Sequence, residues 1–100
     1  MIKGLWVNET VVIAGETTRE VVIHGYERKT FWIISNQAGT LWIQAFNEQS
    51  RVCEDWQSTA ILASTLTSYQ TLHGSRLMRL RFIPGLAATV SAWVVLEGVP

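Results

Sequence analysis

Apolar and β-branched residues gather in short runs along this chain, and turn-forming residues separate the runs. The clearest run covers residues 29–47, where Lys29–Ser35 and Thr40–Phe46 flank the cluster Asn36-Gln37-Ala38-Gly39. Aromatic and β-branched residues on both sides of a glycine-containing turn are typical of a β-hairpin. We therefore predict a hairpin at the centre of the chain.

The two faces of this predicted hairpin differ in polarity. Side chains alternate across a strand, and a turn with an even number of residues keeps cross-strand partners on one face. One face is then wholly apolar and is expected to line the core: Trp32, Ile34, Leu41, Ile43 and Ala45. The other, which we call the mixed face, carries Phe31, Ile33, Ser35, Thr40, Trp42, Gln44 and Phe46. This mixture predicts that another protein covers the mixed face.

The remaining chain contains further strand signals and no helical stripe. Strands are expected within residues 9–14, 18–24, 59–64, 65–72, 77–83 and 87–96, and the first two are candidates for a second hairpin. Residues 77–83 alternate strictly, with Met78, Leu80 and Phe82 inward and Arg79 and Arg81 outward. The polar residues 47–55 follow no period and are expected to form an exposed loop.

Short strands with turn signals at regular spacing predict an all-β protein. Seven to eight strands suit an antiparallel β-sandwich, with a jelly-roll-like topology preferred and an immunoglobulin-like sandwich as the alternative. One hundred residues suffice for one domain, which we assign to residues 9–100. Residues 1–8 are expected to form an N-terminal arm or an edge strand.

Composition and net charge restrict the kinds of molecule that the chain is expected to bind. Hydrophobic residues make up 48% of the chain and charged residues only 16%, so its surface should tend to associate. Eight basic and eight acidic side chains cancel, which predicts neither nucleic-acid nor membrane binding. Asn8 and Glu9 interrupt the only apolar run near the N-terminus, and no stretch approaches membrane-spanning length. We expect synthesis in the cytoplasm.

Few residues suit catalysis or metal binding. His24 and His73 are the only histidines, and no histidine, cysteine or aspartate pair stands at metal-ligand spacing. Cys53 and His73 remain open as a nucleophile and base, but nothing in the sequence activates the thiol, and there is no glycine elbow or phosphate-binding loop. We predict no catalytic residues, no metal and no cofactor.

Five tryptophans leave two interpretations open. Tryptophan fills sandwich cores and contributes strongly to protein interfaces. Exposed indoles also stack on sugar rings, so a glycan-binding module with Trp42 and Trp56 as platforms is the alternative.

Arginines on the strand at residues 77–83 also leave two interpretations. Arg79 and Arg81, with Arg76, either form a solvated face or bind acids such as Glu20 or Glu54 of a neighbouring copy. Leu5 and Trp6 are candidates for an arm that reaches an adjacent subunit. The predicted interface residues are therefore Leu5, Trp6, Phe31, Ile33, Trp42, Phe46, Arg79 and Arg81.

The order of elements over residues 29–96 adds a resemblance. It comprises Ile34-Ser-Asn-Gln-Ala-Gly-Thr-Leu-Trp-Ile-Gln44, a later Trp56, and Arg79-Leu-Arg-Phe82 before Pro84-Gly85 and a closing apolar strand. This order resembles small β-sandwich virion proteins of tailed bacteriophages and prophages, such as capsid decoration and fibre or tail accessory modules. The resemblance implies a structural, non-enzymatic role in the virion. It also implies a homo-oligomer, with a trimer as one option, that binds a capsid or tail protein after synthesis in the host cytoplasm.

Overall fold

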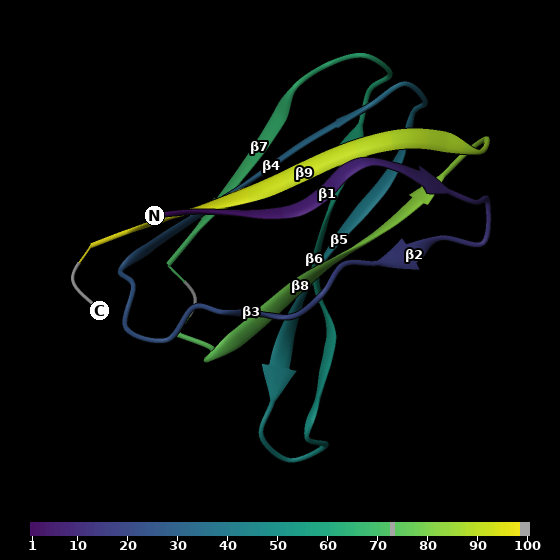
Figure 1. Ribbon diagram of the computed structural model, residues 1–100. Helices are drawn as coiled ribbons and strands as arrows, with labels where there is room; N and C mark the ends of the chain where they lie inside the picture. The colour runs from purple at the N-terminus through teal and green to yellow at the C-terminus, as the bar shows by residue number, and fades with distance from the viewer. Residues whose placement is uncertain (73, 99–100) are drawn as a thin grey trace.

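Two antiparallel β-sheets pack face to face in the computed structural model, which describes residues 1–72 and 74–98 (Figure 1). Sheet A has the strand order β1 (Ile2–Val11), β9 (Ala88–Glu97), β4 (Arg28–Ser35) and β7 (Thr67–Thr71). Sheet B has the order β2 (Glu16–Thr17), β8 (Leu77–Pro84), β5 (Gly39–Asn47) and β6 (Val52–Ile61), and β3 (Val21–Val22) also pairs with β8.

Strands β2 and β3 are the two ends of one interrupted strand along β8. Glu16 lies opposite Phe82 and Val21 opposite Met78. Between them the N–H of Thr18 donates to the Leu80 carbonyl at 2.8 Å, and the Thr18 hydroxyl accepts from the Leu80 N–H at 3.0 Å. The predicted hairpin of residues 9–14 with 18–24 is therefore wrong, because these segments pair with β9 and β8 instead.

Strands that follow one another in the chain otherwise lie in opposite sheets, except β5 and β6, which pair as a hairpin. This order is that of a jelly roll, in which each sheet takes alternate strands of the chain. The predicted antiparallel, jelly-roll-like β-sandwich is confirmed. The described residues form nine strands rather than seven or eight, because the stretch between β1 and β4 is split in two.

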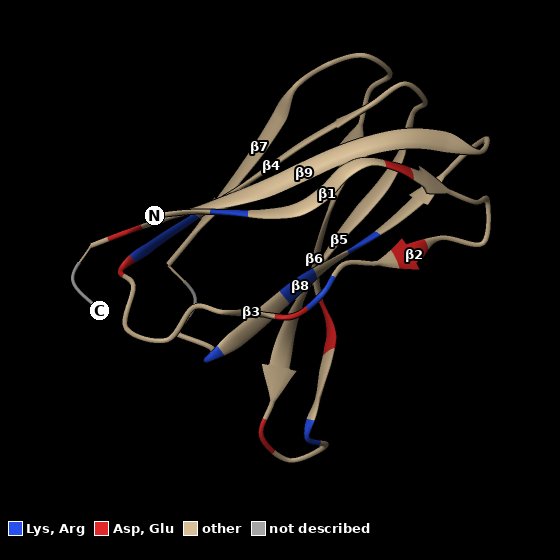
Figure 2. Ribbon diagram, viewed as in Figure 1, with Lys and Arg blue, Asp and Glu red and all other residues tan. Residues whose placement is uncertain are grey.

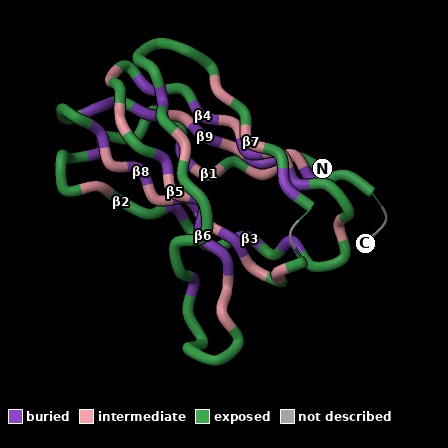
Figure 3. The backbone as a smooth tube through the Cα atoms, turned by 180° about the vertical axis from the view of Figure 1, so that it is seen from behind, coloured by how far each residue is buried: buried purple, intermediate pink, exposed green. Residues whose placement is uncertain are grey.

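The core fills the space between the sheets. Met78, Leu80 and Phe82 of β8 have no exposed surface, while Arg79 and Arg81 between them point outward, as predicted. The same alternation runs along β9, where residues 88, 90, 92, 94 and 96 are buried. Figure 3 shows buried and more exposed residues alternating along the strands of both sheets.

The predicted central hairpin is wrong, although both of its strands exist. β4 pairs with β9 and β7 in sheet A, whereas β5 pairs with β8 and β6 in sheet B. The connection at residues 36–38 crosses from one sheet to the other. This connection is hydrogen-bonded to the turn after β8, where the Gly85 N–H donates to the Ala38 carbonyl at 2.9 Å. It is also bonded to the start of β9, where the Thr89 N–H donates to Asn36 Oδ1 at 2.9 Å.

This crossing reverses the predicted faces of β4. Phe31 and Ile33 are each 1% exposed and lie in the core, while Trp32 and Ile34 point away from it. In β5 the predicted faces are correct, with Leu41, Ile43 and Ala45 buried. A strand pattern alone does not say whether its neighbour in sequence is its partner in the sheet or faces it across the core.

The hairpin that the chain does form joins β5 to β6. Its register runs from Gly39 opposite Ile61 to Asn47 opposite Val52, and Figure 1 shows its tip projecting beyond the rest of the sandwich. The prediction of an exposed loop at residues 47–55 is correct in exposure, apart from Asn47 and Cys53, but correct as a loop only at the turn, because β6 begins at Val52. β6 is an edge strand, which explains why polar residues are tolerated there.

Residues 2–11 form an edge strand on sheet A. β1 pairs with β9 from Ile2 opposite Val95 to Val11 opposite Ala88, and the Met1 ammonium donates to the Leu96 carbonyl at 3.0 Å. The register shifts between Gly4 and Trp6 and again between Trp6 and Glu9. Such bulges protect an edge strand from pairing with other chains.

Gly39 stands where the crossing connection enters β5, and we expect Gly39→Ala to destabilise the fold. An added Cβ would lie 2.5 Å from the Ile83 carbonyl oxygen and 2.7 Å from Pro84 Cα, and these backbone atoms have little freedom to retreat. Chemical denaturation should show a loss of about 2 kcal/mol or more. Gly4→Ala is the control, because its Cβ would meet nothing within 4 Å. Equal stability of the two variants would contradict this role of Gly39.

Candidate functional site

The outer face of sheet B brings together aromatic rings and arginines from β5 and β8. Trp42 lies directly opposite Arg81, whose guanidinium carbon is 5.7 Å from the indole centroid. Near the end of β5, the guanidinium carbon of Arg76, the residue just before β8, lies 4.5 Å over the ring of Phe46. We call Trp42, Phe46, Arg76, Arg79 and Arg81 the arginine–aromatic face. An arginine on a ring is attracted by the ring quadrupole and restricted in motion.

A hydrogen-bonded chain of side chains orders the middle of this face. Arg79 Nε donates to Gln44 Oε1 at 2.6 Å, and Gln44 Nε2 donates to Asp55 Oδ1 at 2.7 Å. Arg81 Nη2 donates to the second oxygen of Asp55 at 2.8 Å, and Arg79 Nη1 lies 3.9 Å from Glu20 Oε1. The two outward arginines therefore have acidic partners within their own chain. The sequence analysis had suggested acidic residues of a neighbouring copy, such as Glu20, as their partners, whereas here Glu20 and Asp55 of the same chain pair with them.

This network lowers the pKa of the Asp55 carboxyl. Burial alone would raise its pKa, but the hydrogen bonds from Gln44 and Arg81 and the charges of Arg81 and Arg79 outweigh burial, so the pKa lies below its ordinary value. The neighbouring Glu54 also has a lowered pKa, because Ser50 and Asn47 donate hydrogen bonds to its carboxylate. Asp55 is therefore ionised near neutral pH and anchors the arginines.

Four predicted interface residues belong to the chain's own interior or pack against it. Phe31 and Ile33 are core residues, and Trp6 of β1 is only 8% exposed. Leu5 is partly buried and packs against the same core cluster. The prediction that these side chains are free to meet a neighbour is therefore wrong for Phe31, Ile33 and Trp6, because the two sheets need them to fill the space between them. Trp42, Phe46, Arg79 and Arg81 do share one outer face, as described above.

The outer face of sheet A forms a second candidate surface, which the sequence interpretation missed. Trp32 lies opposite Trp93, and their rings are nearly parallel, with 11° between planes and 6.3 Å between centroids. Neighbouring outward positions on the four strands complete what we call the uncharged face: Ile2, Gly4, Thr30, Trp32, Ile34, Ser68, Gln70, Ser91, Trp93 and Val95. Figure 2 shows charged residues on sheet B and its connections, on β1 and at the start of β4, whereas β7 and most of β9 carry none. Arg28 and Glu97 lie opposite each other at the end of the outward rows of β4 and β9, beyond the uncharged face.

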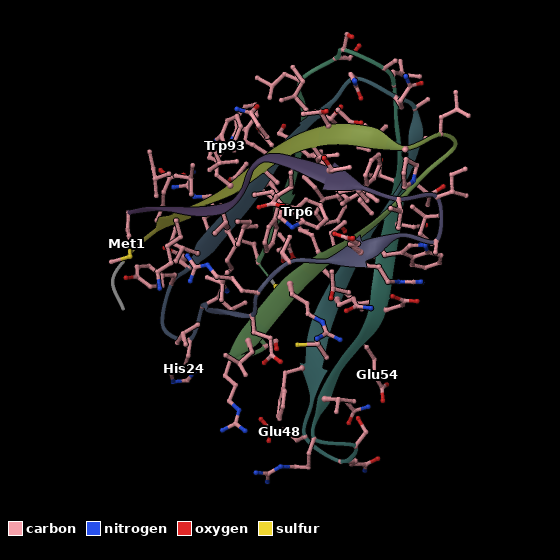
Figure 4. The ribbon with its side chains drawn as sticks, turned by 45° about the vertical axis from the view of Figure 1, so that its right-hand side comes forward. Met1, Trp6, His24, Glu48, Glu54 and Trp93 are labelled. Carbon is pink, nitrogen blue, oxygen red and sulfur yellow. The ribbon has the colours of Figure 1, made fainter. Side chains whose placement is uncertain are left out.

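A signal for the uncharged face was present in the sequence. Residues 87–96 are apolar on both faces of the last strand, which placed Trp93 and Val95 outward whenever Ala92 and Val94 were inward. The partner strand was hidden by the assumed hairpin, because that register put Trp32 and Ile34 into the core. Figure 4 shows Trp93 on the outer side of β9, while Trp6 lies between the sheets.

The other predicted sites are placed as follows. Trp56 is the extra residue of a bulge between the Ile43–Gln57 and Gln44–Asp55 pairs, is 38% exposed, and meets Tyr69 edge to face at 6.5 Å. Cys53 is buried, and burial together with the Glu20 charge raises the pKa of its thiol, which disfavours the thiolate. His73 lies outside the described residues, so its relation to Cys53 has no structural description.

Within residues 1–72 and 74–98, no three histidine, cysteine, aspartate or glutamate side chains converge as a metal site. No helix in this part of the chain has both the length and the apolar character needed to cross a membrane.

Structural comparison shows that the β-sandwich of this chain is similar in fold to three solved structures, two of which are prophage proteins. The PBSX exported protein XepA superposes with a TM-score of 0.80 and 16% identity, over 100% of this chain and 38% of XepA. The SPBc2 prophage-derived protein YomS has a TM-score of 0.67 and 11% identity, over 97% of this chain and 92% of YomS. PirA has a TM-score of 0.57 and 13% identity, over 96% and 93% of the two chains.

These likenesses concern the fold alone, because all three identities are low. The chain spans 38% of the length of XepA, so it corresponds to one part of that longer protein. No protein-family model and no curated sequence matches the chain. The resemblance to prophage-derived proteins is thus supported by structure, at the level of the sandwich.

Acid titration tests the Asp55 network. Because the pKa of Asp55 is lowered in the folded chain, its ion pair stabilises the fold above the ordinary value of 3.8, and this stabilisation is lost as the pH falls through the folded value. Melting temperatures measured from pH 6 down to 2.5 should therefore fall less steeply below about pH 4 in Asp55→Asn than in the parent chain. Arg81→Lys keeps the charge and should retain most of the parent's slope. An unchanged slope in Asp55→Asn would contradict the network.

Alanine substitution of the two phenylalanines separates core from surface. Phe31→Ala should lower the free energy of unfolding by about 3–5 kcal/mol, because Phe31 is 1% exposed and its removal leaves a cavity. Phe46→Ala should cost less, since Phe46 is only partly buried beneath Arg76. Urea denaturation compares the two variants, and a larger loss in Phe46→Ala would argue against the reversed face of β4.

Proposed function

We propose that this chain is a non-enzymatic structural protein of a tailed phage or prophage, which self-associates in the virion and attaches to a capsid or tail surface. The observation that carries this proposal is the arginine–aromatic face. Tryptophan and arginine are enriched among the residues that contribute most to protein–protein binding. Here one tryptophan, three arginines and Phe46 lie on the outer surface of one sheet, and all five side chains are at least partly exposed.

The charges of this face suit a contact between identical copies. Its three arginines have three acidic partners, with distances of 3.3 Å for Arg76–Glu48, 3.9 Å for Arg79–Glu20 and 2.8 Å for Arg81–Asp55. In a two-fold contact the same patch meets itself, so a patch with both signs in equal number avoids self-repulsion.

One of these pairs is suited to exchange between copies. The Arg79–Glu20 pair is the longest of the three, and the Glu20 side chain is 44% exposed. An exposed, long ion pair contributes little to folding. Exchange of Glu20 for the same residue of a neighbouring copy would therefore cost the single chain little. A neighbour would also shield the half-buried rings of Trp42 and Phe46 from water.

The fold comparison supports the phage setting. XepA and YomS are named as PBSX and SPBc2 prophage products, and the present chain has the same sandwich. The attachment to a capsid or tail protein rests on the resemblance of residues 29–96 to virion modules. What XepA does as a whole protein is not carried over, since the chain matches only part of it.

Light scattering coupled to size-exclusion chromatography tests self-association. The parent chain should elute with the mass of an oligomer, and Trp42→Ser should shift it toward a single chain, weakening association about tenfold or more. Arg79→Glu should do the same, because it places a like charge beside Glu20. Trp93→Ser on the opposite sheet is the matched control and should keep the oligomer. Circular dichroism melts confirm that each variant is folded.

A parent chain that stays monomeric at high concentration would refute self-association. An oligomer that persists in folded Trp42→Ser and Arg79→Glu would refute the arginine–aromatic face as its contact.

A further inference from the structure

A shallow groove opens at the end of sheet A where β4 ends and β9 begins. Its volume is about 160 Å³, and its lining comes from β1, β4, β9 and the connections after β4 and β6: Asn8, Ile34, Ser35, Asn36, Ser64, Thr89 and Ser91. Six of these seven residues carry a hydroxyl or an amide, and none of the seven ionises. The groove is therefore polar without being charged.

The backbone fixes the direction of the two asparagines in this groove. Asn8 has a φ of 49°, in the irregular part of β1; its N–H donates to Ser91 Oγ at 3.0 Å, and that hydroxyl lies 3.3 Å from Asn8 Oδ1. Asn36 accepts the Thr89 N–H through Oδ1 at 2.9 Å. Because a backbone N–H can only donate, the oxygen of Asn36 is engaged and its NH₂ group is the end left over.

Both amide NH₂ groups are available as donors. Within the described residues neither Asn8 Nδ2 nor Asn36 Nδ2 donates to a protein acceptor. The hydroxyls of Ser64 and Thr89 likewise have no hydrogen-bond partner in this part of the chain. The groove thus offers several neutral donors and acceptors, of which the asparagine donors are held in position by their own oxygens.

An aromatic surface continues from this groove. Ile34 and Ser91 lie opposite each other across β4 and β9, and Trp32 and Trp93 are the next outward pair along the same strands. Two residues along a strand correspond to about 7 Å. The nearly parallel indoles and the polar groove are therefore neighbours on the uncharged face, and Figure 4 shows Trp93 on the outer side of β9.

We propose that the groove and the Trp32–Trp93 pair together bind a neutral oligosaccharide. A pyranose ring has an apolar C–H face that packs on an indole, and its edge carries hydroxyl groups that pair with amides and serine or threonine hydroxyls. An anionic or cationic ligand would find no opposite charge among the lining residues. A purely apolar ligand would leave the oriented NH₂ groups without partners, which costs free energy. The chemistry of a neutral sugar matches both halves of the surface.

This site differs from the sugar platforms suggested by the sequence. One face of Trp42 carries the guanidinium of Arg81, and Trp56 lies edge to face against Tyr69. Trp32 and Trp93 lie on the other sheet from the arginine–aromatic face, so sugar binding and self-association are independent. Either can fail without the other.

Isothermal titration calorimetry with neutral probes tests the site. Maltotriose, cellotriose, mannotriose, xylotriose and chitotriose are titrated into the folded chain, with trigalacturonate as the acidic control. At least one neutral probe should bind saturably, and Trp93→Ala and Ser91→Ala should each weaken that binding about tenfold or more. Trp42→Ser, on the opposite sheet, should bind as the parent does.

Nuclear magnetic resonance locates the contact. Titration of the bound probe should shift the amide signals of residues 34–36 and 89–91 and the indole N–H signals of Trp32 and Trp93, while the indole signal of Trp42 stays in place. Absence of saturable binding by any neutral probe overturns the proposal, as does binding by trigalacturonate alone. Unchanged affinity in folded Trp93→Ala and Ser91→Ala also overturns it. Size-exclusion chromatography of the same variants reports their self-association separately, so a failure of sugar binding can be told apart from a failure of self-association.

Discussion

The fold depends on one constraint, which is that each sheet must bury one face against the other. Because side chains alternate along a strand, placing Phe31 and Ile33 in the core forces Trp32 and Ile34 outward. The same rule in β8 puts Met78 and Leu80 inward and Arg79 outward. The two outer surfaces therefore consist of the alternate side chains that point away from the core, and these side chains determine what each surface can bind.

These two surfaces differ in how they treat charge. Sheet B concentrates arginines and carboxylates and satisfies them internally, as the chain of hydrogen bonds from Arg79 through Gln44 and Asp55 to Arg81 shows. Arg81 Nε is buried without a hydrogen-bond partner among the described residues, as expected for a guanidinium that lies against an indole, which offers no lone pair. On the outer face of sheet A, β4 and β9 carry no ionised side chain between the Thr30–Val95 pair and the Ile34–Ser91 pair. A partner of one face would be poorly matched to the other.

The sequence predicts the architecture well and the pairing poorly. Strict alternation in residues 77–83 correctly orients β8, because each side chain there is clearly apolar or charged. The residues around Asn36 carry the local features of a hairpin turn, yet they hydrogen-bond to Gly85 and Thr89, about fifty residues along the chain. Local patterns contain no record of such distant partners. The sequence analysis did name Trp42, Phe46, Arg79 and Arg81 of the arginine–aromatic face, because alternation within each strand places them outward. The Trp32–Trp93 pair was missed, because it depends on the distant pairing of β4 with β9.

The polar residues before Trp56 show a second reason why a strand can be missed in a sequence. Edge strand β6 pairs along one side only, so its outward residues face water and need not alternate with apolar ones. Its amino-acid composition therefore resembles that of a loop. Only the tertiary register, with Asp55 opposite Gln44, reveals it as a strand.

The pairing of β1 with β9 also places Met1 beside Leu96, so the first residue of the chain and the end of β9 lie at one pole of the sandwich (Figure 1). The turn between β8 and β9 lies at the far pole, together with Asn8 and Asn36. A second domain or a tether joined at either terminus would stand next to the first pole only. Such an attachment would leave the loops at the far pole sterically accessible.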